Sequence, residues 1–190
     1  MIAAKGIAQL EPLLAKIAEA DVPHAAKETL AHLGRCIEQL DAQLAELERR
    51  LTARHKASPV SRRLAAVPGV GPLTALTVAM TVDARQFESA RPFAAWLGST
   101  PRERSTGGRQ RLGGISRAGN ERLRQLLVVG AMAVIRHARP TSKAASRWLL
   151  RLLERRPRKL AAVALADKAA RTLWTMMANG TAYRRPPQAA

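Results

Sequence analysis

Residues 30–51, LAHLGRCIEQLDAQLAELERRL, decide the class of the fold through the regular spacing of their apolar side chains. Steps of three and four residues alternate through the segment, at Leu30, Leu33, Ile37, Leu40, Leu44, Leu47 and Leu51. This spacing puts all seven side chains on one stripe of an α-helix. Charged and polar residues fill most of the other positions. The segment predicts a long amphipathic helix, and we call its apolar stripe the heptad seam.

The sequence leaves two partners open for the heptad seam. Residues 7–20 could fold back onto it as the second helix of an antiparallel pair, with the turn at Val22 and Pro23. Alternatively, the seam forms a coiled coil between two chains, because a helix of three heptads is marginal on its own. Under either interpretation, residues 1–58 form a helical hairpin or coiled-coil linker.

The positive charge of the chain lies entirely after this linker. The 190 residues carry a formal net charge of +18. Residues 1–58 hold eight basic and eight acidic residues, whereas residues 59–190 hold 24 basic and six acidic ones. An excess of this size predicts binding to a polyanion. We therefore expect a basic helical domain at 59–183, followed by a tail at 184–190.

Several classes of protein are excluded by composition. Cys36 is the single cysteine, so an intramolecular disulfide is impossible and a reducing compartment fits. The start of the chain does not read as a signal peptide, and no run approaches the roughly 20 apolar residues of a membrane span. The four histidines share no ligand spacing with Cys36, and we expect no metal site. These features predict a cytoplasmic protein with no membrane partner.

Residues 67–72, VPGVGP, separate two short helices that we expect at 60–67 and 72–82. A helix, a Gly-rich turn and a second helix are typical of a helix-hairpin-helix. Its glycines, here Gly69 and Gly71, would expose backbone N–H groups to a phosphate at the start of the second helix. The alternative is an ordinary turn between two packed helices.

Residues 101–124, PRERSTGGRQRLGGISRAGNERLR, combine seven arginines with five glycines and three hydroxyl side chains. Arginine forks match phosphate geometry, and glycine lets a backbone approach a ligand closely. We expect a loop with limited strand character at 98–118. The predicted nucleic-acid contacts are Gly69, Gly71, Arg102, Arg104, Gly107, Gly108, Arg109, Arg111, Arg117 and Asn120.

The rest of the chain predicts further helices and a mainly α fold. Apolar periodicity indicates helices at 89–97, 119–137, 143–155 and 158–178. Trp96, Trp148 and Trp174 fall at core spacing and predict packing rather than base stacking. Asp167 lies on an apolar stripe and needs a partner, for which Arg171 is one helical turn away.

These segments together resemble the C-terminal domain of insertion-sequence-110-type transposases, the RNA-guided recombinases of bacterial mobile elements. The resemblance covers about residues 60–183, and the heptad segment is similar to the coiled-coil linker of the same proteins. Ser99 and Asp167 depart from the pattern of the family. The matching segments are 67–75 (VPGVGPLTA), 93–98 (FAAWLG), 100–102 (TPR), 105–108 (STGG), 112–120 (LGGISRAGN), 123–127 (LRQLL), 163–171 (VALADKAAR) and 182–183.

The resemblance implies a serine nucleophile that attacks a DNA phosphodiester. On this chain that residue is Ser105, with Thr106 as the rival in register and the neighbouring arginines as clamps on the phosphate. From the residues alone, a serine in a Gly-rich loop is more typical of a turn or a phosphate contact. Ser116 begins the next helix and is expected to be its N-cap.

The resemblance also implies an acidic RuvC-like domain with Mg²⁺, which would supply the base and the metal. Residues 1–58 are too few and too helical to hold it, so this chain looks like the C-terminal half of a truncated transposase. No cofactor is expected on this chain, and alone it should bind DNA without cutting it.

Three interpretations of function follow. The first is a transposase fragment for DNA strand exchange that forms a homo-oligomer through the heptad seam at 30–51. Whether a guide RNA is also bound stays open. The second is a non-catalytic helix-hairpin-helix protein that binds nucleic acid, and the third is the product of a degraded gene with no role.

Overall fold

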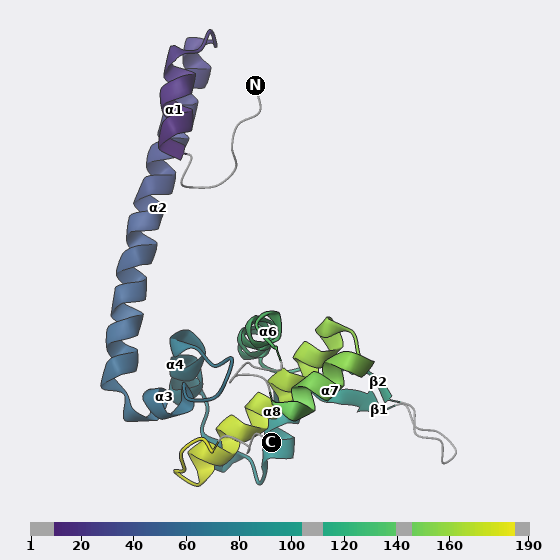
Figure 1. Ribbon diagram of the computed structural model, residues 1–190. Helices are drawn as coiled ribbons and strands as arrows, with labels where there is room; N and C mark the ends of the chain where they lie inside the picture. Colours follow the sequence, from purple (N-terminus) through teal and green to yellow (C-terminus); the bar gives the residue numbers. More distant parts are fainter. Residues whose placement is uncertain (1–9, 104–111, 140–145, 185–190) are drawn as a thin grey trace. The chain divides into compact units, whose positions relative to one another are not determined.

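The structure, a computed structural model, describes residues 10–103, 112–139 and 146–184. The mainly α fold is confirmed, since helices make up most of the described chain (Figure 1). The chain divides into two compact units, residues 1–50 and 51–190, and the division falls inside one long helix. No described helix is both long enough and apolar enough to cross a membrane.

The first unit contains the helix α1 (Leu10–Glu19) and most of α2 (His24–Ala57). The two helices run antiparallel, because Leu14 lies over Gly34 and the Lys27 ammonium donates to the carbonyl of Ala18 at 2.8 Å. Gly34 is buried under this contact. The predicted helical hairpin is therefore present, and α1 packs on the face of α2 that contains Gly34.

The heptad seam is not the face of α2 that α1 covers. All seven seam side chains remain between 36% and 58% exposed. An apolar stripe of this length on one helix is more than the scattered exposed leucines that monomers tolerate. The antiparallel pair thus leaves the seam without a partner among the described residues.

In the second unit, the last turns of α2 are followed directly by α3 (Pro59–Leu64). The Ser58 hydroxyl caps α3 by accepting from the backbone N–H of Ser61, and Pro59 occupies the first turn. The buried Ser61 hydroxyl lies 2.8 Å from Nδ1 of His55, near the end of α2. The predicted start at Ser58 and Pro59 is confirmed.

The turn after α3 leads into α4 (Pro72–Thr81) and packs on the helix α6 (Glu121–Arg136). Gly69 has a φ of 84°, which favours glycine, and its carbonyl lies where a side chain of Gly130 would be. A Cβ at Gly130 would overlap that oxygen. Both glycines are thus required by a close approach of two backbones.

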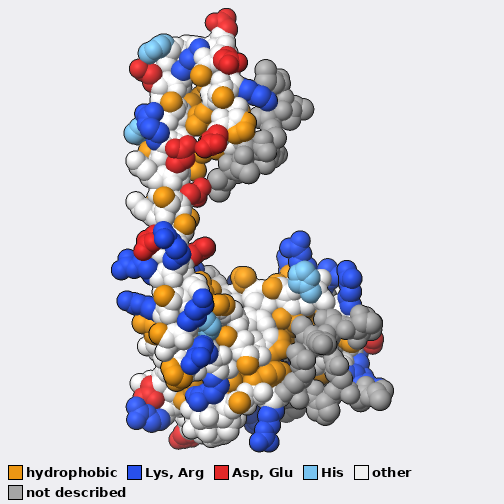
Figure 2. All heavy atoms as spheres, turned by 60° about the vertical axis from the view of Figure 1, so that its left-hand side comes forward, with side chains coloured by type: hydrophobic (Ala, Val, Ile, Leu, Met, Phe, Trp, Pro, Cys, Tyr) orange, Lys and Arg blue, Asp and Glu red, His pale blue; other side chains and the backbone are white. Residues whose placement is uncertain are grey.

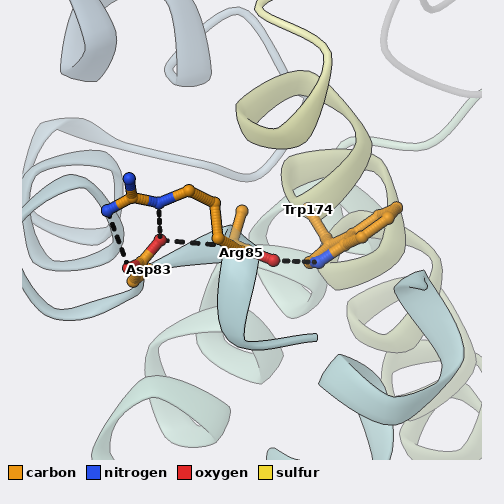
Figure 3. Close-up of polar contacts among 4 residues, drawn as sticks. Asp83, Arg85 and Trp174 are labelled. Atoms are coloured by element: carbon orange, nitrogen blue, oxygen red, sulfur yellow. Dashed lines mark hydrogen bonds and ion pairs between the residues drawn. The ribbon is translucent and has the colours of Figure 1, made fainter. Parts of the chain in front are cut away.

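The connection from α4 to α5 (Ala90–Trp96) contains a short 3₁₀ helix, η2 (Ala84–Gln86). Figure 3 shows that Asp83 accepts from the backbone N–H of Arg85 and from its guanidinium. These hydrogen bonds hold the pKa of the Asp83 carboxyl below its usual value. The indole of Trp174 donates to the carbonyl of Ala84 at 3.1 Å, which ties η2 to the C-terminal helix.

The tryptophans only partly follow the prediction of core packing. Trp174 is half-buried, and Trp96 stacks on the fully buried Phe93 with ring centroids 5.8 Å apart. However, Trp96 and Trp148 are each 37% exposed, and the Lys168 ammonium sits 4.4 Å from the centroid of Trp148. The prediction was wrong for Trp148, near the start of α7 (Arg147–Arg155), because its ring is exposed and lies against the Lys168 ammonium.

The Arg/Gly-rich segment starts and ends in a two-stranded antiparallel sheet, β1 (Pro101–Glu103) and β2 (Leu112–Ile115). Pro101 pairs with Ile115, and a register shift separates this pair from the next one. The expected limited strand character is confirmed.

The core of the second unit forms around the C-terminal helix α8 (Arg158–Ala178), whose predicted range was correct. Five buried alanines on α8 let α6 and α5 pack closely against it: Ala161, Ala162, Ala166, Ala169 and Ala170. Phe93, Leu123 and Leu173 are fully buried in the same core. Helix α8 thus packs against α5, which precedes the Arg/Gly-rich segment, and against α6, which follows its strands.

Replacement of Gly130 by alanine tests the backbone contact with Gly69. Glycine to alanine inside an exposed helix normally stabilises by about 0.5–1 kcal/mol. Here we expect Gly130→Ala to destabilise the protein by about 1–3 kcal/mol in urea unfolding, because the methyl group overlaps the Gly69 carbonyl. Gly114→Ala, whose Cβ would meet nothing within 4 Å, is the matched control. A stabilising Gly130→Ala would contradict the contact.

Candidate nucleic-acid interface

The base of the β1–β2 hairpin is a crossing of two chain segments, residues 96–100 and 116–119. Gly98 has a φ of 68° and lies directly against the Ala118 carbonyl, while Gly119 has a φ of 82° and lies against the Trp96 carbonyl. A Cβ at either glycine would overlap backbone atoms. The crossing is closed by hydrogen bonds from the N–H of Ser116 to Thr100 at 2.9 Å and from that of Arg117 to Gly98 at 3.1 Å.

Arg124, on α6, forms hydrogen bonds with both segments of this crossing. Its side chain is buried in α6, with 8% of the residue exposed. Its Nη1 donates to the carbonyl of Leu97 at 2.8 Å and to that of Ala118 at 3.2 Å, one on each segment. A buried guanidinium is tolerated only when hydrogen bonds compensate its lost hydration. Arg124 therefore links the end of α5 to the start of α6.

Sequence reasoning missed the role of Arg124, although the sequence contains a signal. Arg124 shares one stripe of α6 with the buried side chains of Leu127, Ala131 and Val134. An arginine at the first position of an apolar stripe indicates a buried cation with backbone acceptors nearby.

The structure places some of the predicted contact residues in local roles. The Arg102 guanidinium donates to the Ser116 carbonyl at 2.9 Å, across the hairpin. Arg117 is exposed and has a φ of 57°, an uncommon conformation for arginine. Asn120 is the N-cap of α6 and accepts from the N–H of Leu123 at 2.9 Å. The N-cap prediction for Ser116 was wrong, because the N-cap of α6 lies four residues later, at Asn120.

The two glycines of the 67–72 turn face different surroundings. Gly69 packs on α6, whereas Gly71 is exposed and a Cβ there would meet nothing within 4 Å. Gly71 is also the N-cap of α4, which has no side-chain cap. Of the pair, Gly71 is the one with free space around it.

Seven predicted site residues lie outside the described residues: Arg104, Ser105, Thr106, Gly107, Gly108, Arg109 and Arg111. The described geometry comprises the two strands that lead into this segment and out of it.

Asp167 belongs to a small polar cluster beside the hairpin base. Its carboxylate pairs with Nη2 of Arg171 at 2.7 Å, as predicted. The Ser99 hydroxyl lies 3.3 Å from the other carboxylate oxygen and 3.0 Å from the Ala94 carbonyl. The two residues that depart from the family pattern, Ser99 and Asp167, thus contact each other. Arg91, Thr100 and Arg171 line an open hollow of ≈ 550 Å³ next to them.

The electrostatic character of the second unit is strongly positive. Figure 2 shows many more Lys and Arg than Asp and Glu side chains over this unit, on the face that it draws. In the described part of residues 51–190, only Arg85 and Arg171 form an ion pair with a carboxylate. A surface with this many unpaired cations fits a polyanionic ligand.

Comparison with known proteins identifies the family. Residues 61–147 match the transposase IS116/IS110/IS902 family. The chain belongs to this transposase family. The resemblance inferred from the sequence motifs is thereby confirmed, and the match includes the 67–72 turn, the hairpin and α6.

Curated relatives of this transposase-family chain extend the match to both units. It is 45% identical over 97% of its length to the transposase y4pF/y4sB of Sinorhizobium fredii. It is 41% identical over 76% of its length to the transposase for insertion sequence element IS1111A of Coxiella burnetii. These alignments cover 49% and 40% of the two relatives, so the chain spans about half the length of the relatives it matches, or less.

Substitution of Arg124 tests its role at the hairpin base. Arg124→Met leaves the carbonyls of Leu97 and Ala118 without their donor, and we expect a loss of about 2–3 kcal/mol in unfolding free energy. Arg124→Lys keeps the charge but not the forked guanidinium, and we expect its loss of unfolding free energy to lie between those of the unchanged protein and Arg124→Met. The control is Arg122→Met on the exposed side of α6, expected to stay within about 0.5 kcal/mol. Equal values for Arg124→Met and Arg122→Met in urea unfolding would contradict the bridge.

Proposed function

We propose that this chain binds DNA and supplies the hydroxyl of Ser105 as the nucleophile of transposition. The observation that carries the proposal is membership of the transposase family over the segment that contains Ser105. The hairpin base supports it, because β1 and β2 start and end at a backbone crossing that fixes where the segment leaves and rejoins the core. Thr106 remains the rival nucleophile.

The proposed reaction is a transesterification at a DNA phosphodiester. The Ser105 oxygen bonds to phosphorus as the bond from phosphorus to the leaving strand breaks. One phosphoester bond replaces another, so the energy of the bond is kept for the later joining step. The serine proton passes to a base, and the departing oxygen accepts a proton. Arginines such as Arg102 and Arg117, at the two ends of the segment, stabilise the negative charge on the phosphoryl oxygens.

The Mg²⁺ that the family resemblance implies does not fit the residues described here. No three His, Cys, Asp or Glu side chains within 10–103, 112–139 and 146–184 converge on a point where a metal could bind. The base for Ser105 is assigned by the proposal to the part of the longer relatives that this chain does not match.

The proposed assembly is a homo-oligomer through the heptad seam. It rests on the continuous exposure of the seam along α2 and on the fact that α1 packs on a different face. A second copy of the same helix would bury leucine against leucine at these positions. Two chains would then bring two hairpins to one DNA complex.

The second candidate function is a non-catalytic helix-hairpin-helix module. The exposed Gly71 and the uncapped start of α4 favour a phosphate contact there. This candidate shares DNA binding with the first and differs in the absence of covalent chemistry. Both candidate functions are compatible with a guide RNA as a further ligand.

Alanine substitution separates the two functions. We expect Ser105→Ala, made at the aligned serine of a full-length relative, to reduce transposition by at least about 10³-fold, because the nucleophile is lost. DNA affinity should stay unchanged, and the covalent protein–DNA adduct seen on a denaturing gel should disappear. Thr106→Ala is the control. Normal transposition by Ser105→Ala with loss in Thr106→Ala would assign the reaction to Thr106, and normal activity in both would exclude this catalytic mechanism.

Lysine substitutions in the heptad seam test whether the seam joins two chains. Leu40→Lys with Leu44→Lys places two cations in the seam, and we expect the dissociation constant of the dimer to rise at least about 100-fold in sedimentation equilibrium. Gln39→Lys with Ala42→Lys adds the same charge on exposed positions outside the seam and should leave the dimer intact. Equal weakening by both pairs would indicate general charge repulsion instead.

A further inference from the structure

A row of arginines follows one face of α7. Arg147, Arg151 and Arg155 are spaced by four residues, and all three are exposed. The opposite face of α7 holds Leu149, buried against the core. Successive arginines on this face rise by about 6 Å along the helix axis. This spacing is comparable with the distance between neighbouring phosphates along one nucleic-acid strand.

The row continues around the corner between α7 and α8. Only Arg156 and Pro157 separate the two helices, and α8 opens with Arg158 and Lys159. All four cations from Arg155 to Lys159 are exposed. This corner therefore concentrates charge over a five-residue stretch.

The end of α6 meets this corner at an open hollow of ≈ 540 Å³. Arg136, His137 and Arg158 line it, together with apolar atoms of Met132 and Ile135. Arg136 of α6 and Arg158 of α8 thus converge on one concave surface. We call the surface formed by the row, the corner and this hollow the α7–α8 surface.

The fold does not account for these charges. Between Arg122 and Ala166 the sequence has one acidic residue, Glu154. Neither Glu154 nor any other described carboxylate lies within ion-pair distance of the arginines of the α7–α8 surface. The first turn of α8 has no acidic residue, so the cations there oppose the helix dipole instead of balancing it. Charges that a fold does not use are expected where a ligand uses them.

We infer that the α7–α8 surface is a second binding site for the sugar–phosphate backbone of a nucleic acid. The inference goes beyond the proposed function, which places DNA at the segment that the hairpin carries. Helix α6 separates the two sites: Asn120 at its start adjoins the hairpin, and Arg136 at its end lines the hollow. Sixteen residues of helix correspond to about 24 Å.

The distance sets the kind of ligand that reaches both sites. A duplex advances about 3.4 Å per base pair, so about seven base pairs separate contacts at the two ends of α6. One continuous duplex longer than this, or two separate strands, can occupy both sites. The exposed aromatic side chain beside the row, Trp148, has the Lys168 ammonium 4.4 Å from its ring centroid. A row of exposed arginines next to a ring that already carries a cation favours contacts with phosphates over stacking with bases.

The salt dependence of binding measures the phosphate contacts directly. The variant Arg151→Gln, Arg155→Gln, Arg158→Gln removes three cations from the α7–α8 surface. The control Lys16→Gln, Arg35→Gln, Arg50→Gln removes three exposed cations from residues 1–58, where acidic and basic residues balance. Both variants are titrated by fluorescence anisotropy against a 20-base-pair DNA duplex, the same sequence as an RNA duplex, and single-stranded DNA. Circular dichroism checks that all proteins remain folded.

We expect the slope of log Kobs against log salt to become shallower by about 2.7 on duplex DNA for the α7–α8 variant, about 0.9 per phosphate contact. The control should retain the slope of the unchanged protein. A loss restricted to the RNA duplex or to single strands would support the site and identify that ligand. Slopes equal to those of the control on all three ligands would overturn the inference.

A second measurement needs no substitution. Acetylation of lysines followed by mass spectrometry should show Lys159 protected by the bound duplex, with Lys16 unprotected in the same sample. Equal acetylation of Lys159 with and without DNA would count against the site. The proposed function is tested separately, by the covalent adduct between Ser105 and DNA. If that adduct forms but the α7–α8 variant keeps the salt slope of the unchanged protein, only the inference about the α7–α8 surface is overturned.

Discussion

The buried guanidinium of Arg124 is the interaction on which the second unit depends most directly. It donates to one carbonyl at the end of α5 and to another just before α6, so it is satisfied only when both segments are in place. Removal of a cation from water is expensive unless such acceptors are supplied. The same crossing excludes side chains at Gly98 and Gly119. The β1–β2 hairpin therefore leaves the core from a point defined by backbone atoms, which vary less in position than side chains.

Helix α6 carries this constraint to the rest of the unit. Its start is linked to the hairpin by Arg124, its middle touches the turn at Gly69, and its end lines the hollow with Arg158. Alanines on α8 allow α6 to lie close along most of its length. The turn, the hairpin and the α7–α8 surface are consequently displayed at fixed intervals along one helix. A nucleic acid that contacts more than one of them would meet a rigid spacing and need not order the protein as it binds.

Periodicity was enough to predict the elements, and less suited to predict their contacts. The range of α8 and the start at Ser58 followed from apolar spacing and from the chemistry of caps, which are local properties. The phosphate contact predicted for Gly69 stays a prediction, whereas its packing on α6 was not predicted, because a Gly-rich turn has the same local sequence whether it faces a ligand or a helix. Its partner, Gly130, is 61 residues away. No local pattern could identify that contact.

The caps of α6 and the role of Arg124 illustrate the same limit. Ser116 and Asn120 are both good N-caps, and the choice depended on the crossing at Gly119, which forces the chain to turn once more before the helix. Arg124 was counted with the exposed arginines of its segment, although it lies on the apolar stripe of α6. Composition treats all seven arginines of 101–124 alike. Burial separates the one that supports the fold from Arg102, Arg117 and Arg122, which remain exposed.

The distribution of charge connects stability with binding. The first 58 residues are balanced, while the basic excess of +18 is concentrated in a single unit with few ion pairs among its described residues. Like charges at this density repel one another and oppose compaction. The second unit offsets that repulsion through apolar packing around α8 and through buried hydrogen bonds such as those of Arg124. A polyanion bound to the folded surface would remove the repulsion and add a stabilisation that grows with its concentration. If the proposed binding holds, the same arginines that weaken the isolated unit would favour the folded state when nucleic acid is present.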